Sequence, residues 1–220
     1  MEQSMSLSAA EAVRPLSVAM KEGSAQEHRA AEQSPFVSDL LSGRVNEQGY
    51  TDYLLRLRMV YEALEDAVRT RLDDPIVAAV YDPALERLTA IDQDLEHWAP
   101  GAAREVDSPA AQAYRDGIVE ASWGGDLVAH HYTRYLGDLS GGQAIGRILD
   151  RTFNLDGAGL AFYDFPMRPK PYKDSYRDRL DGLDVDADGV DRAVDEVKVA
   201  FGLNQAIFDE LAGNLPAYRR

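Results

Sequence analysis

Tyr135-Leu-Gly-Asp-Leu-Ser-Gly-Gly-Gln-Ala-Ile-Gly146 is the stretch of this chain that decides the fold. Its flanks, from Asp126 to Asp150, have the apolar periodicity of one continuous amphipathic helix. Each glycine in a helix interior costs roughly 1 kcal/mol relative to alanine, so the four glycines here give up about 3 to 4 kcal/mol of helix propensity. We therefore expect another group to approach this backbone closely, or the helix to bend here.

The four glycines fall into two pairs with helical spacing. Gly137 and Gly141 are four residues apart, as are Gly142 and Gly146, so each pair leaves one helix face without side chains. Close helix packing or a kink would also use small residues at this spacing. Asp138 favours a functional reading, because a carboxylate beside a bare helix face can act on a molecule that lies there.

Length and composition limit the class of protein. A chain of 220 residues is long enough for one well-buried core, so we expect a single domain over residues 1–220, with a core from about 15 to 212 and flexible termini. A net charge of −15 argues against a nucleic-acid-binding surface, which needs clustered Lys and Arg, and makes a basic protein partner plausible.

The chain contains no cysteine, which excludes disulfides, thiolate metal sites and cysteine nucleophiles. No apolar run reaches the ~18 residues that a membrane span requires, and residues 1–10 lack the features of a signal peptide. We therefore expect a cytoplasmic protein without a membrane segment.

Helix signals dominate the sequence, so the predicted fold class is all-α. A capping residue directly precedes proline at Ser34, Asp74, Asp82 and Ser108, a pattern that starts helices. Asn46 is expected to cap a helix that runs to about Leu72, and Gly43 to end the short helix before it. Further helices are expected over 15–33, 83–98, 109–122, 126–154, 172–182 and 187–213, with an extended crossing segment over 157–171.

His28 is the histidine whose neighbours suggest a role. Glu32 lies four residues later on the same helix face, and a metal-bound histidine usually donates its other N–H to such an acceptor. An ordinary surface pair would have the same spacing. His130 and His131 are adjacent and should point to different faces, and His97 is expected to be structural.

Two further clusters carry charge. Lys173 and Arg177 lie four apart on a predicted helix and could recognise a carboxylate or a phosphate, although a solvated helix face explains them equally. Asp184-Val-Asp-Ala-Asp-Gly189 matches the start of a calcium-binding EF-hand loop, with Asp195 at the twelfth position. That match is partial, so we favour a polar helix connection capped by aspartates.

Taken together, these residues resemble the haem oxygenase family, in particular its compact bacterial members. Tyr132-Thr-Arg-Tyr-Leu-Gly-Asp-Leu-Ser-Gly-Gly-Gln143 resembles the family's distal-helix signature nearly letter for letter. Other segments resemble family blocks in the same order, over about residues 15 to 212: Ala25-Gln-Glu-His28 with Glu32, Tyr61-Glu-Ala-Leu-Glu65, Tyr172-Lys-Asp-Ser-Tyr-Arg177 and Phe201-Gly-Leu-Asn204.

The resemblance implies a helical bundle in which haem b lies between a proximal helix and a kinked distal helix. His28 would be the axial ligand of the haem iron, with Glu32 beside it. Gly137, Gly141 and Gly142 would leave room for dioxygen on the other face. Asp138 would deliver protons through ordered water, and Tyr61, Arg134 and Asn204 would help to hold that water.

The resemblance also implies how haem is held and what is made from it. Lys21, Tyr132, Lys173 and Arg177 would bind the haem propionates, and Phe201 would line the site. Some relatives have a second basic residue at the position of Ala25, where this chain has none. The products would be biliverdin, carbon monoxide and ferrous iron, and the expected electron donor is a soluble protein of the ferredoxin or flavin reductase type. We expect a monomer.

Two other functions fit part of the sequence. A haem-binding or haem-storing module would need His28 but not Asp138 with its glycines. A helical calcium-responsive protein would rest on residues 184–195 alone.

Overall fold

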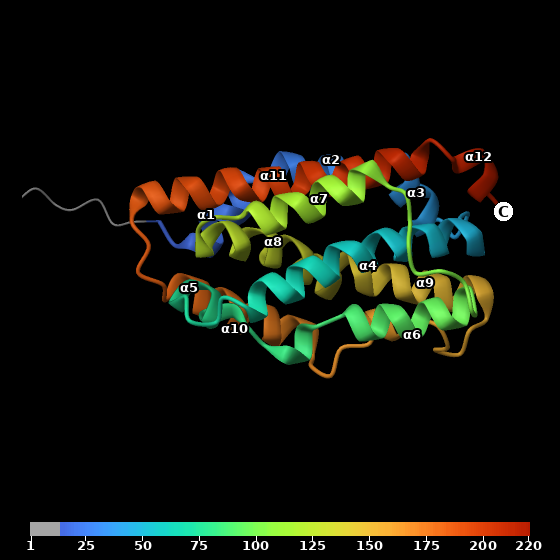
Figure 1. Ribbon diagram of the computed structural model, residues 1–220, viewed down its shortest axis with the longest axis horizontal. Helices are drawn as coiled ribbons and strands as arrows, with labels where there is room; N and C mark the ends of the chain where they lie inside the picture. Colours follow the sequence, from blue (N-terminus) through green and yellow to red (C-terminus); the bar gives the residue numbers. More distant parts are fainter. Residues whose placement is uncertain (1–13) are drawn as a thin grey trace, which may run out of the picture.

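The structure is a computed structural model that describes residues 14–220, and these residues form one all-helical bundle (Figure 1). The expectations for the N-terminal end fall on residues 1–13, outside the described part. The helices are α1 Leu16–Gly23, α2 Ala25–Glu32, α3 Pro35–Leu41, α4 Glu47–Arg69, α5 Pro75–Val80, α6 Leu88–Trp98, α7 Pro109–Glu120, α8 Gly124–Gly137, α9 Gln143–Phe153, α10 Pro169–Asp181, α11 Ala187–Ala212 and α12 Leu215–Tyr218. Three short turns join them: η1 Pro83–Leu85, η2 Asp138–Gly142 and η3 Ala161–Tyr163.

The five predicted helix caps are confirmed. The side chain of Asn46 accepts a hydrogen bond from the N–H of Gly49 and begins α4. The four predicted capping residues that precede a proline also accept a hydrogen bond, through their side chains, from a backbone N–H in the turn that follows. They are Ser34, Asp74, Asp82 and Ser108. These caps satisfy N–H groups that have no partner inside the helix.

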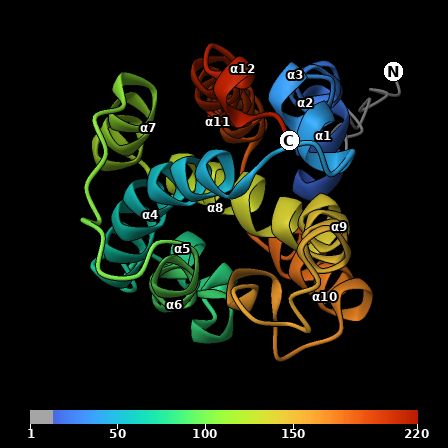
Figure 2. The same ribbon diagram turned by 90° about the vertical axis from the view of Figure 1, so that its right-hand side faces the viewer.

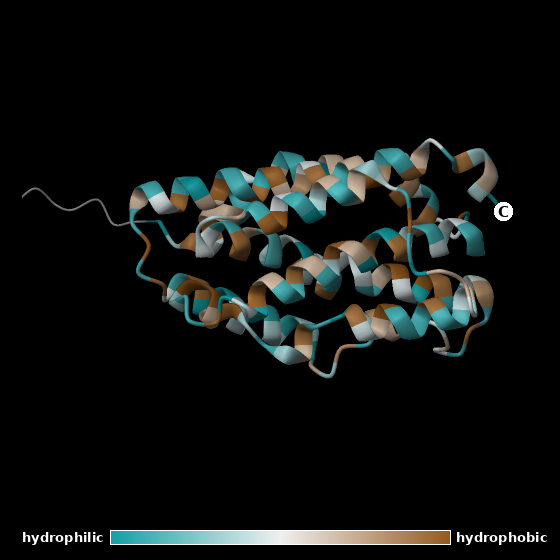
Figure 3. Cartoon of the chain, in the orientation of Figure 1, coloured by the Kyte–Doolittle hydropathy of each residue, from teal (hydrophilic) through white to brown (hydrophobic). Residues whose placement is uncertain are grey.

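Two long helices form the centre of the bundle. Seen end-on in Figure 2, α4 and α8 lie between a group that contains α1, α2, α3, α7 and α11 and a group that contains α5, α6 and α10. Leu54, Leu57 and Leu64 of α4 are fully buried. Figure 3 shows hydrophobic and hydrophilic stretches along each long helix, as expected for helices with one buried face.

Several expected helices are shorter or broken. The helix expected over 15–33 is interrupted at Ser24, whose hydroxyl turns back to donate to the carbonyl of Met20. The one expected over 83–98 begins as the turn η1 and restarts at Leu88, with a buried Arg87 at the break. The helix from Asn46 ends at Arg69, not Leu72.

The segment over 157–171 was expected to be extended, and this is wrong at two places. Residues 161–163 form the helical turn η3, and α10 begins at Pro169 rather than at 172. Pro169 and Pro171 both fit the first turn of α10, since the N–H groups there make no bond within the helix. Pro75–Val80 forms a helix, α5, that was absent from the expected elements although its cap was recognised.

The C-terminal residues beyond 212 contact the bundle. Val45 and Arg219 form an isolated β-bridge, and the N–H of Asn46 donates to the carbonyl of Tyr218. The hydroxyl of Tyr218 lies 2.6 Å from Asp52 on α4. Among the described helices, none has the length and apolarity that crossing a membrane demands.

Candidate active site

The glycine-rich stretch forms a π-helical turn between two α-helices. α8 runs into Asp138–Gly142, where the helix widens, and then continues as α9. The continuous helix expected over 126–154 is therefore interrupted. Wider turns of this kind occur mostly as single turns inside α-helices, and frequently at functional sites.

The glycines of this turn have different surroundings. A Cβ atom added at Gly137 or Gly141 would meet nothing within 4 Å, so this face is bare and open. A Cβ at Gly142 would make an ordinary contact, 3.5 Å from the ring of Tyr163. At Gly146 it would come within 3.0 Å of Tyr163, which makes Gly146 a packing residue.

The bare face opens into a cavity of about 490 Å³. From the distal helix (α8, η2 and α9) the cavity is lined by predicted site residues, namely Tyr132, Arg134, Gly137, Asp138, Gly141 and Gly142. Other helices contribute Lys21, His28, Glu32, Arg177, Phe201 and Asn204. Twelve of the fourteen predicted site residues thus share one cavity, of a size common for small-molecule and cofactor sites.

His28 presents its imidazole to this cavity from α2. Its side chain is 52% exposed, and Glu32 Oε2 lies 3.6 Å from its Nδ1. The ring of Phe201 packs edge-on against it, with 5.5 Å between the centroids. Because Glu32 faces Nδ1, the nitrogen Nε2 is the one available to a metal.

Asp138 lies within a buried polar network. The hydroxyl of Tyr61 donates to Asp138 Oδ2, and Arg134 Nη2 lies 3.4 Å from Oδ1. Arg134 also donates to Asn204 Oδ1 at 2.6 Å. Burial raises the pKa of Asp138 above its usual value, while the positive charge of Arg134 and the Tyr61 hydrogen bond lower it.

Two predicted site residues do not line the cavity. Tyr61 is fully buried behind Asp138 and acts on the site through its hydroxyl. Lys173 lies on α10, where its Nζ donates to the hydroxyl of Ser140, a lining residue, at 2.7 Å. Burial and the neighbouring charge of Arg177 lower the pKa of Lys173.

The apolar lining of the cavity was not identified from the sequence. Its largest members are Tyr53, Leu136, Ile145, Phe162, Tyr163 and Phe208. Helical periodicity marks such residues as buried but does not say that they face a cavity. Phe162 and Tyr163 lie in the segment expected to cross the bundle, and its aromatic residues were the available signal.

Hydrogen bonds from α6 hold this aromatic segment in place. The carboxylate of Asp94 accepts from the N–H groups of Ala161 and Phe162, at 2.7 and 2.8 Å. Arg87 donates to the carbonyl of Asp164 at 2.8 Å. On the other side, the side-chain amide of Gln143 donates to the carbonyl of Tyr163 at 2.9 Å. Tyr163 is thereby fixed against the glycines of the distal helix.

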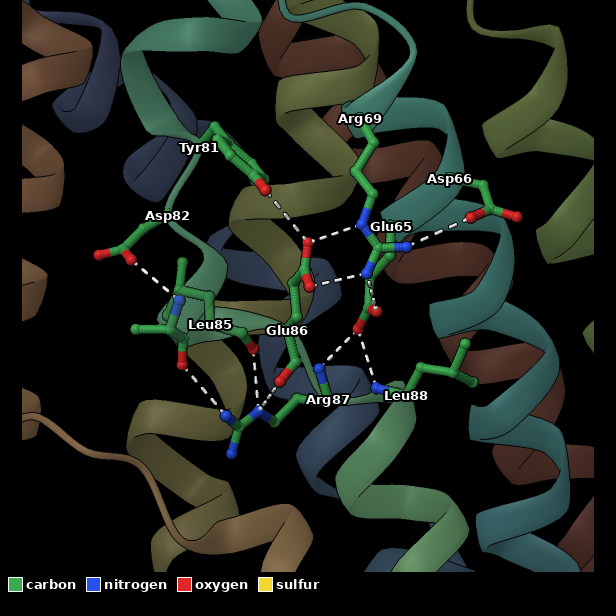
Figure 4. A network of polar contacts seen from close by, with 10 residues as sticks. Glu65, Asp66, Arg69, Tyr81, Asp82, Leu85, Glu86, Arg87 and Leu88 are labelled. Atoms are coloured by element: carbon green, nitrogen blue, oxygen red, sulfur yellow. Dashed lines mark hydrogen bonds and ion pairs between the residues drawn. The ribbon is translucent and has the colours of Figure 1, made fainter.

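Arg87 belongs to a larger polar network that joins α4 to the start of α6 (Figure 4). The buried carboxylate of Glu65 accepts from the N–H groups of Arg87 and Leu88. Arg69 bridges Glu65 and Glu86. Burial raises the pKa of Glu65, and the two N–H groups that it accepts from oppose this shift.

A second hollow, of about 530 Å³, lies behind the segment that carries Tyr163. Asp94, Gln143 and Gly146 line it, together with Arg147 and Asp150. Tyr163 lines both this hollow and the cavity that contains the predicted site residues.

The remaining clusters have structural explanations. His130 bonds to Glu196, whereas His131 bonds to Tyr176, so the adjacent histidines face different helices as expected. Asp186 accepts from the N–H of Gly189 and caps α11, as predicted for a capped connection. Helix α11 runs from residue 187, so most of the EF-hand-like segment is helical rather than a loop. His97 is exposed and packs edge-on against Trp98.

Comparison with known proteins agrees with this geometry. The family model described as Heme oxygenase matches residues 14–210. Heme oxygenase 1 of Synechocystis sp. is 39% identical over 202 residues, covering 89% of this chain and 84% of the relative. Human Heme oxygenase 1 is 37% identical over 205 residues, with 89% and 71% covered.

Solved structures also match. The crystal structure of heme oxygenase-1 from Synechocystis sp. in complex with heme has a TM-score of 0.88 at 37% identity, covering 93% of this chain and 95% of that one. The structure of heme oxygenase from Leptospira interrogans has a TM-score of 0.84 at 34% identity, covering 90% and 100%. The chain therefore belongs to the haem oxygenase family, all-helical enzymes that degrade haem.

Proposed function

We propose that the cavity lined by His28 and the distal helix binds haem b between α2 and that helix, and that the protein cleaves it to biliverdin, carbon monoxide and ferrous iron. One observation carries the proposal. A histidine paired with a carboxylate and a glycine face without side chains line the same cavity from two separate helices. A solved relative whose crystal structure is described as a complex with heme supports it.

The residues present fit a planar iron ligand. His28 would hold the iron through Nε2, while Glu32 faces Nδ1 and orients the ring. The two open positions at Gly137 and Gly141 leave space where side chains would otherwise stand. Phe201 packs on the imidazole and limits its rotation.

When bound, haem supplies both the iron at which dioxygen reacts and the ring that is cleaved. In this proposal Asp138 carries protons to the site, because its buried carboxyl group lies beside the bare glycine face. Proton transfer from a positioned carboxyl typically contributes 10²- to 10⁴-fold to a rate. Tyr61 and Arg134 hold that carboxyl in place, and Asn204 holds Arg134.

Basic and polar side chains at the cavity would bind the haem propionates. Lys21, Tyr132 and Arg177 line it, and Lys173 reaches its edge through Ser140. Arginine and lysine bind carboxylates through charge-assisted hydrogen bonds. Ala25 also lines the cavity, and because alanine is uncharged it cannot bind a propionate by charge.

The proposal also covers the reaction's partners. Dioxygen is the second substrate, and electrons come from a soluble donor of the ferredoxin or flavin reductase type. The net charge of −15 favours a donor that presents basic groups. A nucleic-acid partner does not fit that charge.

Haem titration and turnover test the proposal. The purified protein should give a sharp Soret band with one equivalent of haem, and His28→Ala should abolish it. His97→Ala is the matched control, because His97 is exposed on α6 and does not line the cavity. With a reductant and oxygen, the Soret band should decay while biliverdin absorbance and carbon monoxide arise.

The outcomes separate the candidate functions. Haem that binds but stays intact would show a storage module and would overturn the enzymatic proposal. Absence of haem binding would reject both functions that involve haem.

A further inference from the structure

His131 is a buried histidine that the proposed chemistry does not use. It lies on α8 with 3% of its surface exposed, and its Nδ1 is 2.8 Å from the hydroxyl of Tyr176 on α10. The two rings are stacked, with 8° between their planes. Tyr135 packs on the imidazole as well, with 4.4 Å between centroids.

Both partners of this hydrogen bond are neutral. Burial, together with the charge of Arg179, lowers the pKa of His131 to about 3. Burial raises the pKa of Tyr176 well above its usual value. Arg179 lies over the ring of Tyr176 at 5.6 Å. The pair is therefore a fixed, uncharged contact between two helices at neutral pH.

The residues that follow His131 and Tyr176 in the sequence both belong to the cavity. Tyr132 follows His131 on α8, and Arg177 follows Tyr176 on α10. Both are proposed to bind propionates. Burial raises the pKa of Tyr132, and the charge of Arg177, which lies near enough to act on it, opposes this shift.

Other contacts hold α10 at its ends. Tyr172 donates to Asp82 at 2.8 Å near the start of α10, and Asp181 accepts from Ser17 at its end. Between residues 14 and 220, the hydrogen bond from His131 to Tyr176 is the one that joins α8 to α10. Lys173 also ties α10 to the distal helix, through Ser140 in η2. The His131–Tyr176 pair therefore sets the position of α10 against α8 itself, next to Tyr132 and Arg177.

We infer that His131 is a positioning residue that sets the in-plane orientation of the bound haem. Through Tyr176 it fixes where Arg177 stands relative to Tyr132 and the distal helix. The ring position nearest the bare glycine face, and hence the biliverdin isomer formed, then depends on a residue that touches neither haem nor oxygen. The inference rests on the proposed function of the cavity.

Substitutions on both sides of the bond test it. His131→Phe and Tyr176→Phe each remove the hydrogen bond and keep an aromatic ring. His131→Asn restores a polar atom near the place of Nδ1. His130→Phe is the matched control, because His130 is equally buried but bonds to Glu196 on α11.

Two measurements report on orientation. NMR of the cyanide complex of the ferric protein reports the haem methyl shifts without turnover, and product analysis gives the ratio of biliverdin isomers. We expect both phenylalanine variants to change that ratio by up to about tenfold, the equivalent of ~1.4 kcal/mol and the upper range for one neutral hydrogen bond. His131→Asn should restore the original ratio and shifts, and His130→Phe should leave them unchanged.

The inference and the proposed function can fail separately. Unchanged haem methyl shifts and isomer ratio in Tyr176→Phe would overturn the positioning role while leaving ring cleavage intact. A merely structural role would lower the melting temperature in these variants without moving either signal, and would also overturn it. Wild-type protein that does not open the haem ring would refute the proposed function itself. If His131→Phe does not fold, the comparison of Tyr176→Phe with wild type decides alone.

Discussion

The hydroxyl of Tyr61 donates a hydrogen bond to the carboxylate of Asp138, although the two residues are 77 positions apart in the chain. Tyr61 is fully buried on α4, and burial raises its pKa well above the usual value, so it remains a donor. Tyr61 of α4 thus holds the carboxylate of Asp138 in place, while Asp138 also lines the cavity. This arrangement fixes the carboxylate before any ligand arrives.

Replacing Asp138 should separate haem binding from ring opening. For Asp138→Ala we expect unchanged stoichiometry of haem binding and a 10²- to 10⁴-fold slower conversion to biliverdin, because the positioned proton carrier is lost. Absorbance during a single turnover measures this. Asp116→Ala, an exposed carboxylate on α7, serves as the control. An unchanged rate in Asp138→Ala would refute the proton-carrier role.

Two glycines of the distal helix should respond in opposite ways to alanine. Gly141→Ala should leave the apoprotein as stable or up to about 1 kcal/mol more stable, since its Cβ meets open space. The same methyl group would enter the cavity and weaken haem binding. Gly146→Ala should lower the free energy of unfolding by about 1 to 3 kcal/mol, because its Cβ would press on Tyr163 at 3.0 Å.

Urea unfolding and haem titration of both variants measure these effects. If Gly141→Ala proves as destabilising as Gly146→Ala, the face at 141 is not open.

His131 should make the fold sensitive to acid. Its pKa is about 3 in the native state and about 6.5 in the unfolded chain, so only the unfolded chain takes up a proton as the pH falls below 6.5. The free energy of unfolding therefore falls as the pH falls, and His131 alone accounts for a decrease of about 2 kcal/mol between pH 7 and pH 5. His131→Asn should remove that part of the loss. Urea unfolding at both pH values measures it, and equal pH dependence in the two proteins would contradict it.

Glu65→Ala should destabilise the bundle from within. It removes the acceptor of two N–H groups at the start of α6, which we expect to lower the free energy of unfolding by about 2 to 4 kcal/mol. Glu62→Ala is the control, because Glu62 lies on the same helix with its side chain 50% exposed. A thermal melt compares the two variants, and equal melting temperatures would show that the network in Figure 4 contributes little.

Local chemistry accounts for what could be predicted from the sequence. Helix caps such as Asn46 and Ser108 bond to residues no more than three positions away. They can therefore be predicted from the sequence without knowing the fold. The motif around Asp138 and the pair of His28 and Glu32 are similarly local, and the cavity brings them together.

The remaining features depend on contacts between distant segments. The break at Ser24 depends on a hydroxyl that turns back to its own helix, which periodicity does not reveal. Tyr163 reaches the distal helix because Asp94 and Arg87 hold its segment, and nothing in residues 157–171 indicates those partners. The hydrogen bond between His131 and Tyr176 joins residues 45 positions apart on two helices. The order of the helices in the sequence does not say which residues of the two lie opposite each other.

The side chain of Tyr163 borders both the haem cavity and the outer hollow. Tyr163 therefore forms part of the wall between the two spaces. A residue with a small side chain here would thin the wall between these two spaces. Keeping bulk water away from a bound haem would then depend on how firmly one aromatic ring is seated.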